Sequence, residues 1–339
     1  MQAHSRKAPR TRSLPSAMAI GAALATFIVL ACLLSLPWTT ARLDVGSGPP
    51  QRRFEATDLR LNLLPPRWWT LAPRDRERLD AALASGKAAP SRWLGTDRLG
   101  RDVLARCLVG GAISVLIGVS AAAIAVVIGT TVGMIAGMAG GRIDAFLMRT
   151  VDVLFGLPSI LLVVLLAVAS DGLVQRAEAD LPAGARQAAN LATLLVAIGA
   201  VSWLTMARVI RGQVMSLRTE PFMEACRAVG VPMRLQLTRH LLPNLRGPIV
   251  VYATLVVPSA ILAESFLSFL GVGIREPLPS WGNLAADGLA ELNPVSSHWW
   301  LLLWPCLLIA LTLVALNFVG EGLRERLDPR SRGRGARAL

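Results

Sequence analysis

The most prominent feature of the chain is a series of long apolar runs that contain no charged residue. Each run is close to or above the roughly 17–20 residues with which a helix crosses about 30 Å of hydrocarbon. Six such runs occur, at 17–36, 108–141, 153–170, 191–207, 247–263 and 299–320. The pattern therefore predicts an all-α membrane protein with six transmembrane helices.

Positive charge is concentrated between these runs. A formal net charge of +13 is compatible with nucleic-acid binding, but the arginines lie in tails and loops, where membrane proteins carry them on the cytoplasmic side. Basic residues precede the first run, which is too long for the apolar core of a signal peptide. We therefore expect a retained anchor, both termini in the cytoplasm and no nucleic-acid partner.

The apolar runs divide the chain into five parts. These are a cytoplasmic tail (1–16), a first transmembrane anchor (17–36), an external loop (37–107), a domain with five transmembrane helices (108–320) and a second cytoplasmic tail (321–339). The external loop is rich in arginine, but loops longer than roughly 60 residues are translocated largely regardless of charge. Its proline pairs at 49–50 and 65–66 predict a small, partly ordered elaboration.

Glycines recur at four-residue spacing in the second run, at Gly129, Gly133, Gly137 and Gly141. On a helix they form one slowly drifting stripe, which lets a neighbouring backbone approach closely. A flexible helix that lines a pore is the alternative. We favour tight helix packing.

The sequence contains no recognisable catalytic or metal-binding motif. Neither of its two lysines, Lys7 and Lys87, is followed by the serine or threonine of a nucleotide-binding loop. The cysteines and histidines are widely separated, and none forms a pair with the spacing of zinc ligands. They are Cys32, Cys107, Cys226, Cys306, His4, His240 and His298. We expect no enzymatic activity, no cofactor and no metal site.

The segment at 220–244, between the fourth and fifth runs, is too strongly patterned for a passive connector. Phe222, Ala225, Cys226 and Val229 recur at helical spacing and predict one apolar face. Gly230 and Pro232 are expected to end that helix, and a second short amphipathic helix is expected to run to Pro243. Such a hairpin fits a docking element for a soluble partner. The alternative is a surface loop that lies on lipid headgroups.

This segment resembles the EAA loop of binding-protein-dependent ABC transporter permeases. The family pattern is Glu-Ala-Ala, three residues, Gly, nine residues, and then Ile-x-Leu-Pro. The chain has Glu224, Ala225, Cys226 and Gly230, followed by His240, Leu242 and Pro243. Cys226 replaces the second alanine and His240 the usual isoleucine; the Arg-His-x-Leu-Pro-Asn ending is common in the oligopeptide branch.

Other stretches are similar to the smaller permease subunits of the oligopeptide, dipeptide and nickel branch. They are 94–102 (LGTDRLGRD), 140–144 (GGRID), 263–271 (AESFLSFLG), 279–282 (PSWG) and 327–329 (LDP). The resemblance covers about residues 94–330 and leaves 37–90 unmatched.

The resemblance implies a type I ABC importer permease fold for 108–320, in a multi-pass protein of the bacterial inner membrane. It also implies a second, homologous permease subunit, two ATPase subunits that hydrolyse ATP, and an external solute-binding protein. The 220–244 loop would couple this chain to an ATPase subunit. Peptides are the expected cargo; nickel or another small solute is the alternative. A non-transporting scaffold or receptor would explain the spans but not the hairpin.

Glu264 lies toward the outer end of the fifth run. A carboxylate at the centre of a bilayer costs about 2.5–3.5 kcal/mol on insertion scales, so the side chain is expected to face the bundle interior or a water-filled cavity. Two interpretations stay open: a residue of the outer gate or pathway, and a residue that pins a neighbouring helix.

Overall fold

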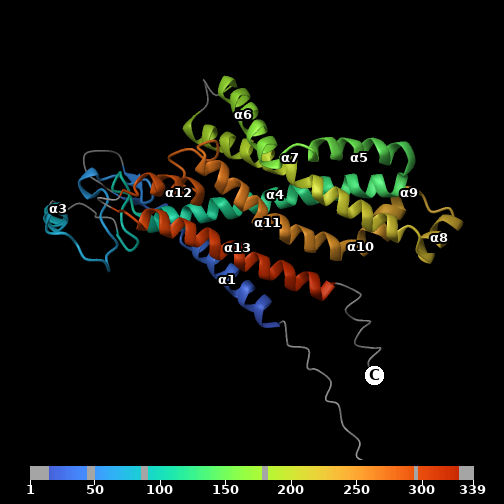
Figure 1. Ribbon diagram of the computed structural model, residues 1–339, viewed down its shortest axis with the longest axis horizontal. Helices are drawn as coiled ribbons and strands as arrows, with labels where there is room; N and C mark the ends of the chain where they lie inside the picture. Colours follow the sequence, from blue (N-terminus) through green and yellow to red (C-terminus); the bar gives the residue numbers. More distant parts are fainter. Residues whose placement is uncertain (1–14, 44–49, 85–90, 178–181, 294–296, 328–339) are drawn as a thin grey trace, which may run out of the picture.

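The protein, seen in a computed structural model that describes residues 15–43, 50–84, 91–177, 182–293 and 297–327, is a bundle of long helices (Figure 1). The long helices are α1 (Pro15–Leu34), α4 (Val103–Ala139), α5 (Gly141–Phe155), α6 (Ser159–Ala177), α7 (Ala183–Leu217), α11 (Arg246–Phe269) and α13 (Trp300–Leu327). The outer parts of the two expected tails, 1–14 and 328–339, lie outside the described residues.

Shorter elements gather at the two ends of the bundle (Figure 1). The α12 end carries α2 (Leu36–Thr39), β1 (Arg42–Leu43), β2 (Gln51–Arg52), the 3₁₀ helix η1 (Leu59–Leu61), α3 (Pro73–Ala84) and α12 (Trp281–Ala290). The strands pair antiparallel, with Arg42 opposite Arg52. The α8 end carries α8 (Pro221–Ala228), α9 (Met233–Leu235), the π-helix η3 (Gln236–Leu241) and α10 (Leu242–Asn244).

Five helical segments are long and apolar enough to cross a membrane: Ala17–Thr39, Val103–Ala139, Gln187–Leu217, Arg246–Phe269 and Trp300–Leu327. A sixth span arises only if the pair Gly141–Phe155 and Ser159–Ala169, bent by 90°, is counted as one. The expectation of one continuous helix over 153–170 is therefore wrong. The break falls before Pro158, which has no N–H to donate and disfavours helical backbone at Leu157.

The most extensive helix contact joins α4 to α7, and glycines make it close. A Cβ atom at Gly129 would lie 2.6 Å from Met206 Cβ, and one at Gly133 would lie 2.6 Å from the Ala207 carbonyl oxygen. Gly137 is similarly close to α7. Gly141 is not part of this contact: it has a φ of +55° and begins α5. It belongs to the turn between the two helices.

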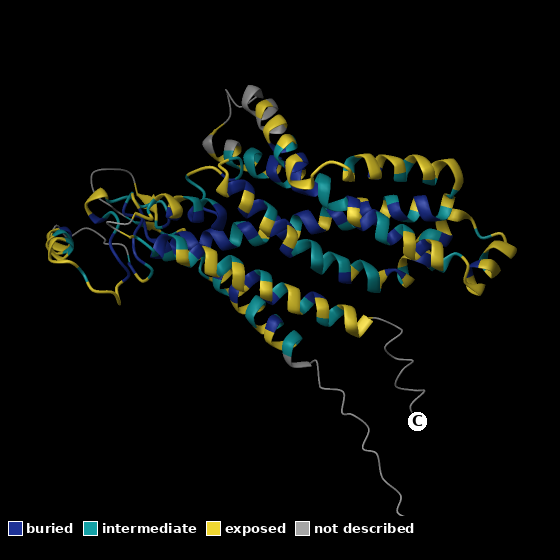
Figure 2. Cartoon of the chain, viewed as in Figure 1, coloured by how far each residue is buried: buried dark blue, intermediate teal, exposed yellow. Residues whose placement is uncertain are grey.

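The N-terminus of α4 is fixed by a cap that the hydropathy pattern does not show. The Asp102 carboxylate accepts hydrogen bonds from the backbone N–H groups of Leu104 (3.0 Å) and Ala105 (3.4 Å). The helix consequently begins five residues before the apolar run, at Val103, and includes Arg106. By contrast with buried α4, most of the surface of α5 is exposed (Figure 2).

Candidate functional site

The segment between α7 and α11 forms a hairpin at the α8 end, as expected. Phe222 and Val229, two residues of the predicted apolar face, are 37% and 82% exposed. Met223, which is not part of that face, is fully buried and packs with Met206, Ile210 and Val214 of α7. Met223 is the anchor that the sequence analysis missed.

The exposed side of α8 carries the residues of the family motif. Glu224 and Ala225 are exposed, and Cys226 is half-buried. On the other side, the Arg227 guanidinium donates hydrogen bonds to the carbonyl oxygens of Met223, at 3.3 Å, and Arg218. The bond to Arg218 ties α8 to the end of α7. The helix therefore presents a fixed surface that carries the acid Glu224 and the apolar side chains of Phe222 and Val229.

Gly230 makes the turn out of α8. Its φ is +77°, and its N–H donates to the Arg227 carbonyl oxygen at 3.0 Å. The N–H of the next residue, Val231, donates to the Cys226 carbonyl oxygen at 3.0 Å. No atom lies within 4 Å of the position that a Cβ would occupy, so the backbone conformation alone, and not space, requires glycine here.

The second half of the hairpin does not end at Pro243. Helical backbone runs from Met233 through Asn244 and, after Leu245, continues into α11. A π-helical turn precedes Leu242, whose N–H donates to the Leu237 carbonyl oxygen. Pro243 is the second residue of α10 and follows directly after that π-helical turn. His240 and Pro243 are half-buried and Leu242 is 36% exposed.

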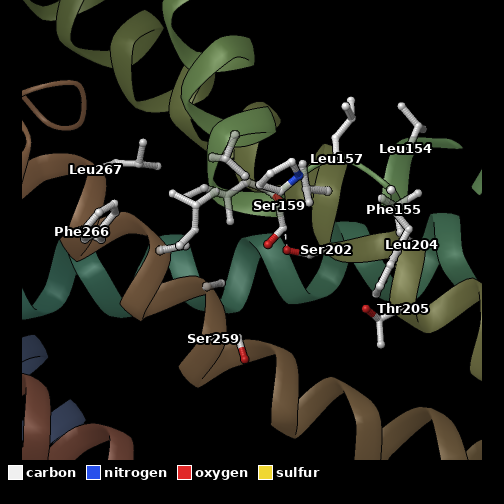
Figure 3. Close-up of a pocket in the computed structure, with 18 residues that line it drawn as sticks. Leu154, Phe155, Leu157, Ser159, Ser202, Leu204, Thr205, Ser259, Phe266 and Leu267 are labelled. Carbon is white, nitrogen blue, oxygen red and sulfur yellow. Dashed lines mark hydrogen bonds between the residues drawn. The ribbon is translucent and has the colours of Figure 1, made fainter. Parts of the chain in front are cut away.

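A cavity of about 550 Å³ lies where α7 and α11 face the α5–α6 bend (Figure 3). Leucine, isoleucine, valine and phenylalanine side chains make up most of its wall. Hydroxyl groups interrupt this apolar wall at Ser159, Ser202, Thr205 and Ser259. No sequence motif indicated these four residues, because they come from elements far apart in the chain.

Glu264 does not line that cavity. Its side chain is fully buried between α11 and α4. One carboxylate oxygen accepts a hydrogen bond from Ser114 Oγ at 2.7 Å, and the other from Ser268 Oγ at 2.8 Å. Ser265 Oγ is 3.4 Å away. The carboxylate thus joins α11 to α4 inside the bundle, away from lipid.

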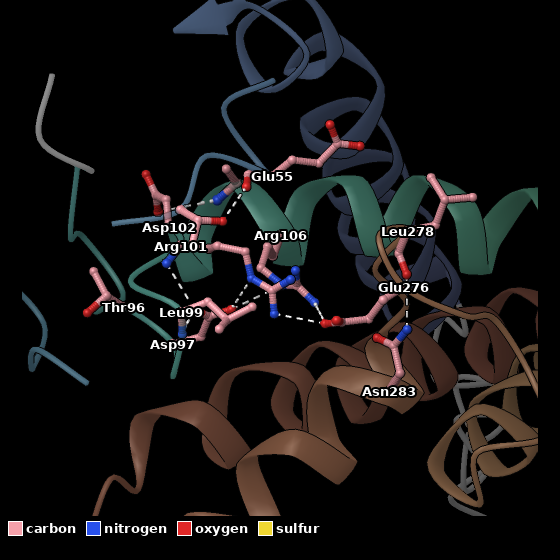
Figure 4. Close-up of polar contacts among 12 residues, drawn as sticks. Glu55, Thr96, Asp97, Leu99, Arg101, Asp102, Arg106, Glu276, Leu278 and Asn283 are labelled. Carbon is pink, nitrogen blue, oxygen red and sulfur yellow. Dashed lines mark hydrogen bonds and ion pairs between the residues drawn. The ribbon is translucent and has the colours of Figure 1, made fainter. Parts of the chain in front are cut away.

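A charged network holds the α12 end together (Figure 4). Arg101 Nε donates to Asp97 at 2.6 Å, and Arg101 Nη2 donates to Glu276 at 2.8 Å. The buried Arg106 lies 3.5–3.6 Å from the same two carboxylates. Partial burial raises the pKa of Glu276, but the two guanidiniums together hold it below its ordinary value. The network links the N-terminus of α4 to the α11–α12 connection.

Comparison with known proteins assigns the family. Residues 129–333 match the family described as "Binding-protein-dependent transport system inner membrane component". The chain is 43% identical to the oligopeptide transport system permease protein OppC of Haemophilus influenzae, over 72% of this chain and 74% of that protein. It is 45% identical to OppC of Escherichia coli, over 71% of this chain and 73% of that protein.

A third relative, the dipeptide transport system permease protein DppC of Bacillus subtilis, is 43% identical over 71% of this chain and 69% of its own length. The resemblance noted from the 220–244 motif is therefore confirmed. The apolar helices agree with the family's description as a membrane component. This multi-pass membrane chain belongs to the family of binding-protein-dependent transport system inner membrane components.

Proposed function

We propose that the chain is one of two permease subunits of an ATP-binding-cassette importer for peptides in a bacterial inner membrane. The observation that carries the proposal is the hairpin at the α8 end. Met223 anchors the segment that resembles the family motif, while Glu224, Phe222 and Val229 are exposed and available to a partner. The oligopeptide and dipeptide permeases among its relatives support peptides as the cargo.

The hairpin would transmit ATP-driven motion from a separate ATPase subunit. Its second half continues through Leu245 into α11, which lines the 550 Å³ cavity. A rotation of the docked hairpin would therefore move the cavity wall directly. ATP hydrolysis is assigned to two separate ATPase subunits, because the chain carries no nucleotide-binding loop.

The cavity is proposed as this subunit's half of the translocation path. Its apolar wall accepts varied side chains, while the hydroxyls of Ser159, Ser202 and Ser259 can bond to a peptide backbone without selecting a sequence. The neighbouring faces of α5 and α6 expose Phe146, Val153 and other large apolar residues. A second, homologous permease would cover this surface, and an external solute-binding protein would deliver the peptide.

Filling the cavity tests this assignment. Ser259→Trp places a large ring on the exposed, cavity-facing side of α11 and should reduce peptide uptake at least tenfold, with normal assembly. Leu262→Trp is the matched control, because Leu262 is 53% exposed on the same helix but does not line the cavity. Uptake of a labelled dipeptide and of nickel would be measured in vesicles that contain the complete transporter.

Equal uptake by the two variants would refute the path assignment. Uptake of nickel but not of peptides would refute the cargo, and absence of any uptake by the unaltered complex would favour a scaffold or receptor. Among the described residues, no group of three or more His, Cys, Asp or Glu side chains is arranged to hold a metal ion.

The proposed topology places both termini and the α8 end in the cytoplasm. Arginines flank α8, among them Arg218, Arg234 and Arg239, as the positive-inside rule requires. A reporter that is active only in the cytoplasm should work when fused after Arg218 or Arg332 and fail after Arg74 or Asn283. Activity after Arg74 would mean that the first span is not a retained anchor.

A further inference from the structure

Four tryptophans meet at the α12 end, two from the segment before α3 and two from the start of α13. The ring centroids of Trp69 and Trp299 lie 5.4 Å apart, and those of Trp68 and Trp299 lie 6.0 Å apart. Trp68 also lies 6.3 Å from Trp304. This cluster, called here the indole cluster, belongs to the part of the chain that the motifs leave without a role.

The position of the indole cluster along α13 sets its depth. Trp299 directly precedes α13, and Trp304 lies one turn inside it. Because the span Trp300–Leu327 is long enough to cross the hydrocarbon, its first turn lies where acyl chains give way to headgroups. Trp68 contacts both ends of that turn and Trp69 contacts its start, so the two rings lie at the same depth. Indole rings are enriched at this interface.

The outer side of the cluster is exposed and apolar. Trp68 is 55% exposed and Trp69 48%, while the indole N–H of Trp68 donates to the Trp93 carbonyl oxygen at 3.1 Å. Its polar group is thus satisfied within the protein. Leu303 and Leu307, both at least 40% exposed on α13, extend the apolar surface along the span. The patch is continuous with surface that the bilayer covers.

The segment that carries Trp68 and Trp69 is fixed to the bundle. Thr96 Oγ1 donates to the Leu61 carbonyl oxygen at 2.7 Å and accepts from the Leu64 N–H at 2.8 Å. The Trp300 indole N–H donates a hydrogen bond to the Thr96 carbonyl oxygen at 3.4 Å. The two rings therefore cannot move away from the level of the α13 start without breaking buried hydrogen bonds.

We propose that Trp68 and Trp69 insert into the headgroup region of the bilayer beside the start of α13 and hold the segment between α2 and α4 on the membrane surface. This interaction with lipid is independent of the cargo. A soluble protein partner would need the same rings to face water. The level of the cluster and its continuity with the lipid-covered face of α13 favour lipid.

Lipid quenching tests the proposal. The complete transporter would be placed in vesicles whose phosphatidylcholine carries bromine on the acyl chains near the headgroup. Bromine should quench part of the tryptophan emission. In the double variant Trp68→Phe/Trp69→Phe, the quenched emission should decrease by the contribution of these two rings. The control Trp281→Phe removes a fully buried indole and should lower total emission without reducing the quenched part.

Aqueous iodide provides the opposing measurement. If iodide quenches the emission of Trp68 and Trp69 while bromolipid does not, the rings face water and the proposal is overturned in favour of a soluble partner. Should the double variant fail to assemble, Trp69→Phe alone keeps the Trp68 hydrogen bond to Trp93 and must lose the share of lipid quenching that belongs to Trp69. An unchanged bromolipid response in that variant would also overturn the proposal.

Discussion

Replacing Gly230 with valine should reduce peptide uptake by roughly tenfold or more while the chain still inserts and assembles. At a φ of +77° a residue with a Cβ is strained by about 1–2 kcal/mol, and a β-branched residue by more. Relief of that strain would rotate α8 relative to the following helical segment and displace Glu224 from its docking position. The measurement is uptake of a labelled peptide at matched transporter abundance.

Gly212 offers a matched control on α7. As at Gly230, no atom lies within 4 Å of the position of its Cβ, but its backbone is helical. Gly212→Val should therefore leave uptake within about twofold of normal, since valine is a better helix former than glycine and no steric conflict arises. Gly230→Asn should keep more activity than Gly230→Val, because asparagine enters the left-handed region more readily. Normal uptake by Gly230→Val would refute the role of the turn in coupling.

Long apolar runs made most of the architecture predictable from the sequence. Hydropathy located every span but one, because a helix in lipid satisfies its own backbone and leaves a continuous apolar signature. It failed at 153–170, where the run is equally apolar on both sides of a 90° bend. Pro158 marked the position of that break, but the direction of the following helix depends on its packing against α7.

The hairpin at 220–244 shows a different limit. Gly230 was identified correctly as the turn, because its residue type reports a backbone conformation. Met223 was not identified as an anchor, since its burial against α7 and Leu241 follows from tertiary contact. Phe222 and Val229 stay exposed although they are apolar. The spacing of apolar residues along a helix cannot distinguish a face that contacts another subunit from a face that packs against the same chain.

The network at the α12 end could not be predicted at all. Arg101 and Glu276 are 175 residues apart in sequence, yet they share a hydrogen bond. The stretch 94–102 was noted only for its resemblance to the family, which says nothing of the partners of Asp97 and Arg101. The hydroxyls that line the cavity are equally dispersed. Residues that act through long-range contact leave no periodic signal in a single sequence.

We expect Glu264 to hold α11 against α4 through its hydrogen bonds. The strongest test compares the assembly and the uptake of two substitutions at this position. Glu264→Gln keeps the shape and an acceptor oxygen, so Ser268 Oγ can still donate, and the Ser114 hydroxyl can rotate to accept from the new amide. Assembly and uptake should stay within about twofold of normal. Glu264→Leu removes both acceptors in a fully buried site and should prevent most of the chain from assembling.

The physical reason for the large effect is the loss of buried hydrogen bonds at one junction. Leaving a buried hydroxyl without a partner costs about 1–3 kcal/mol, and Ser114 would lose its acceptor. Ser268 Oγ would also lose its acceptor and would keep only the hydrogen bond that it accepts from the Ile274 N–H at 3.1 Å. Recovery of intact complex after mild heating measures this loss. Glu321→Leu is the control, because it removes an exposed carboxylate from α13. If Glu264→Gln assembles normally but uptake falls strongly, the charge itself acts in gating, and the tie between α11 and α4 is not its main role.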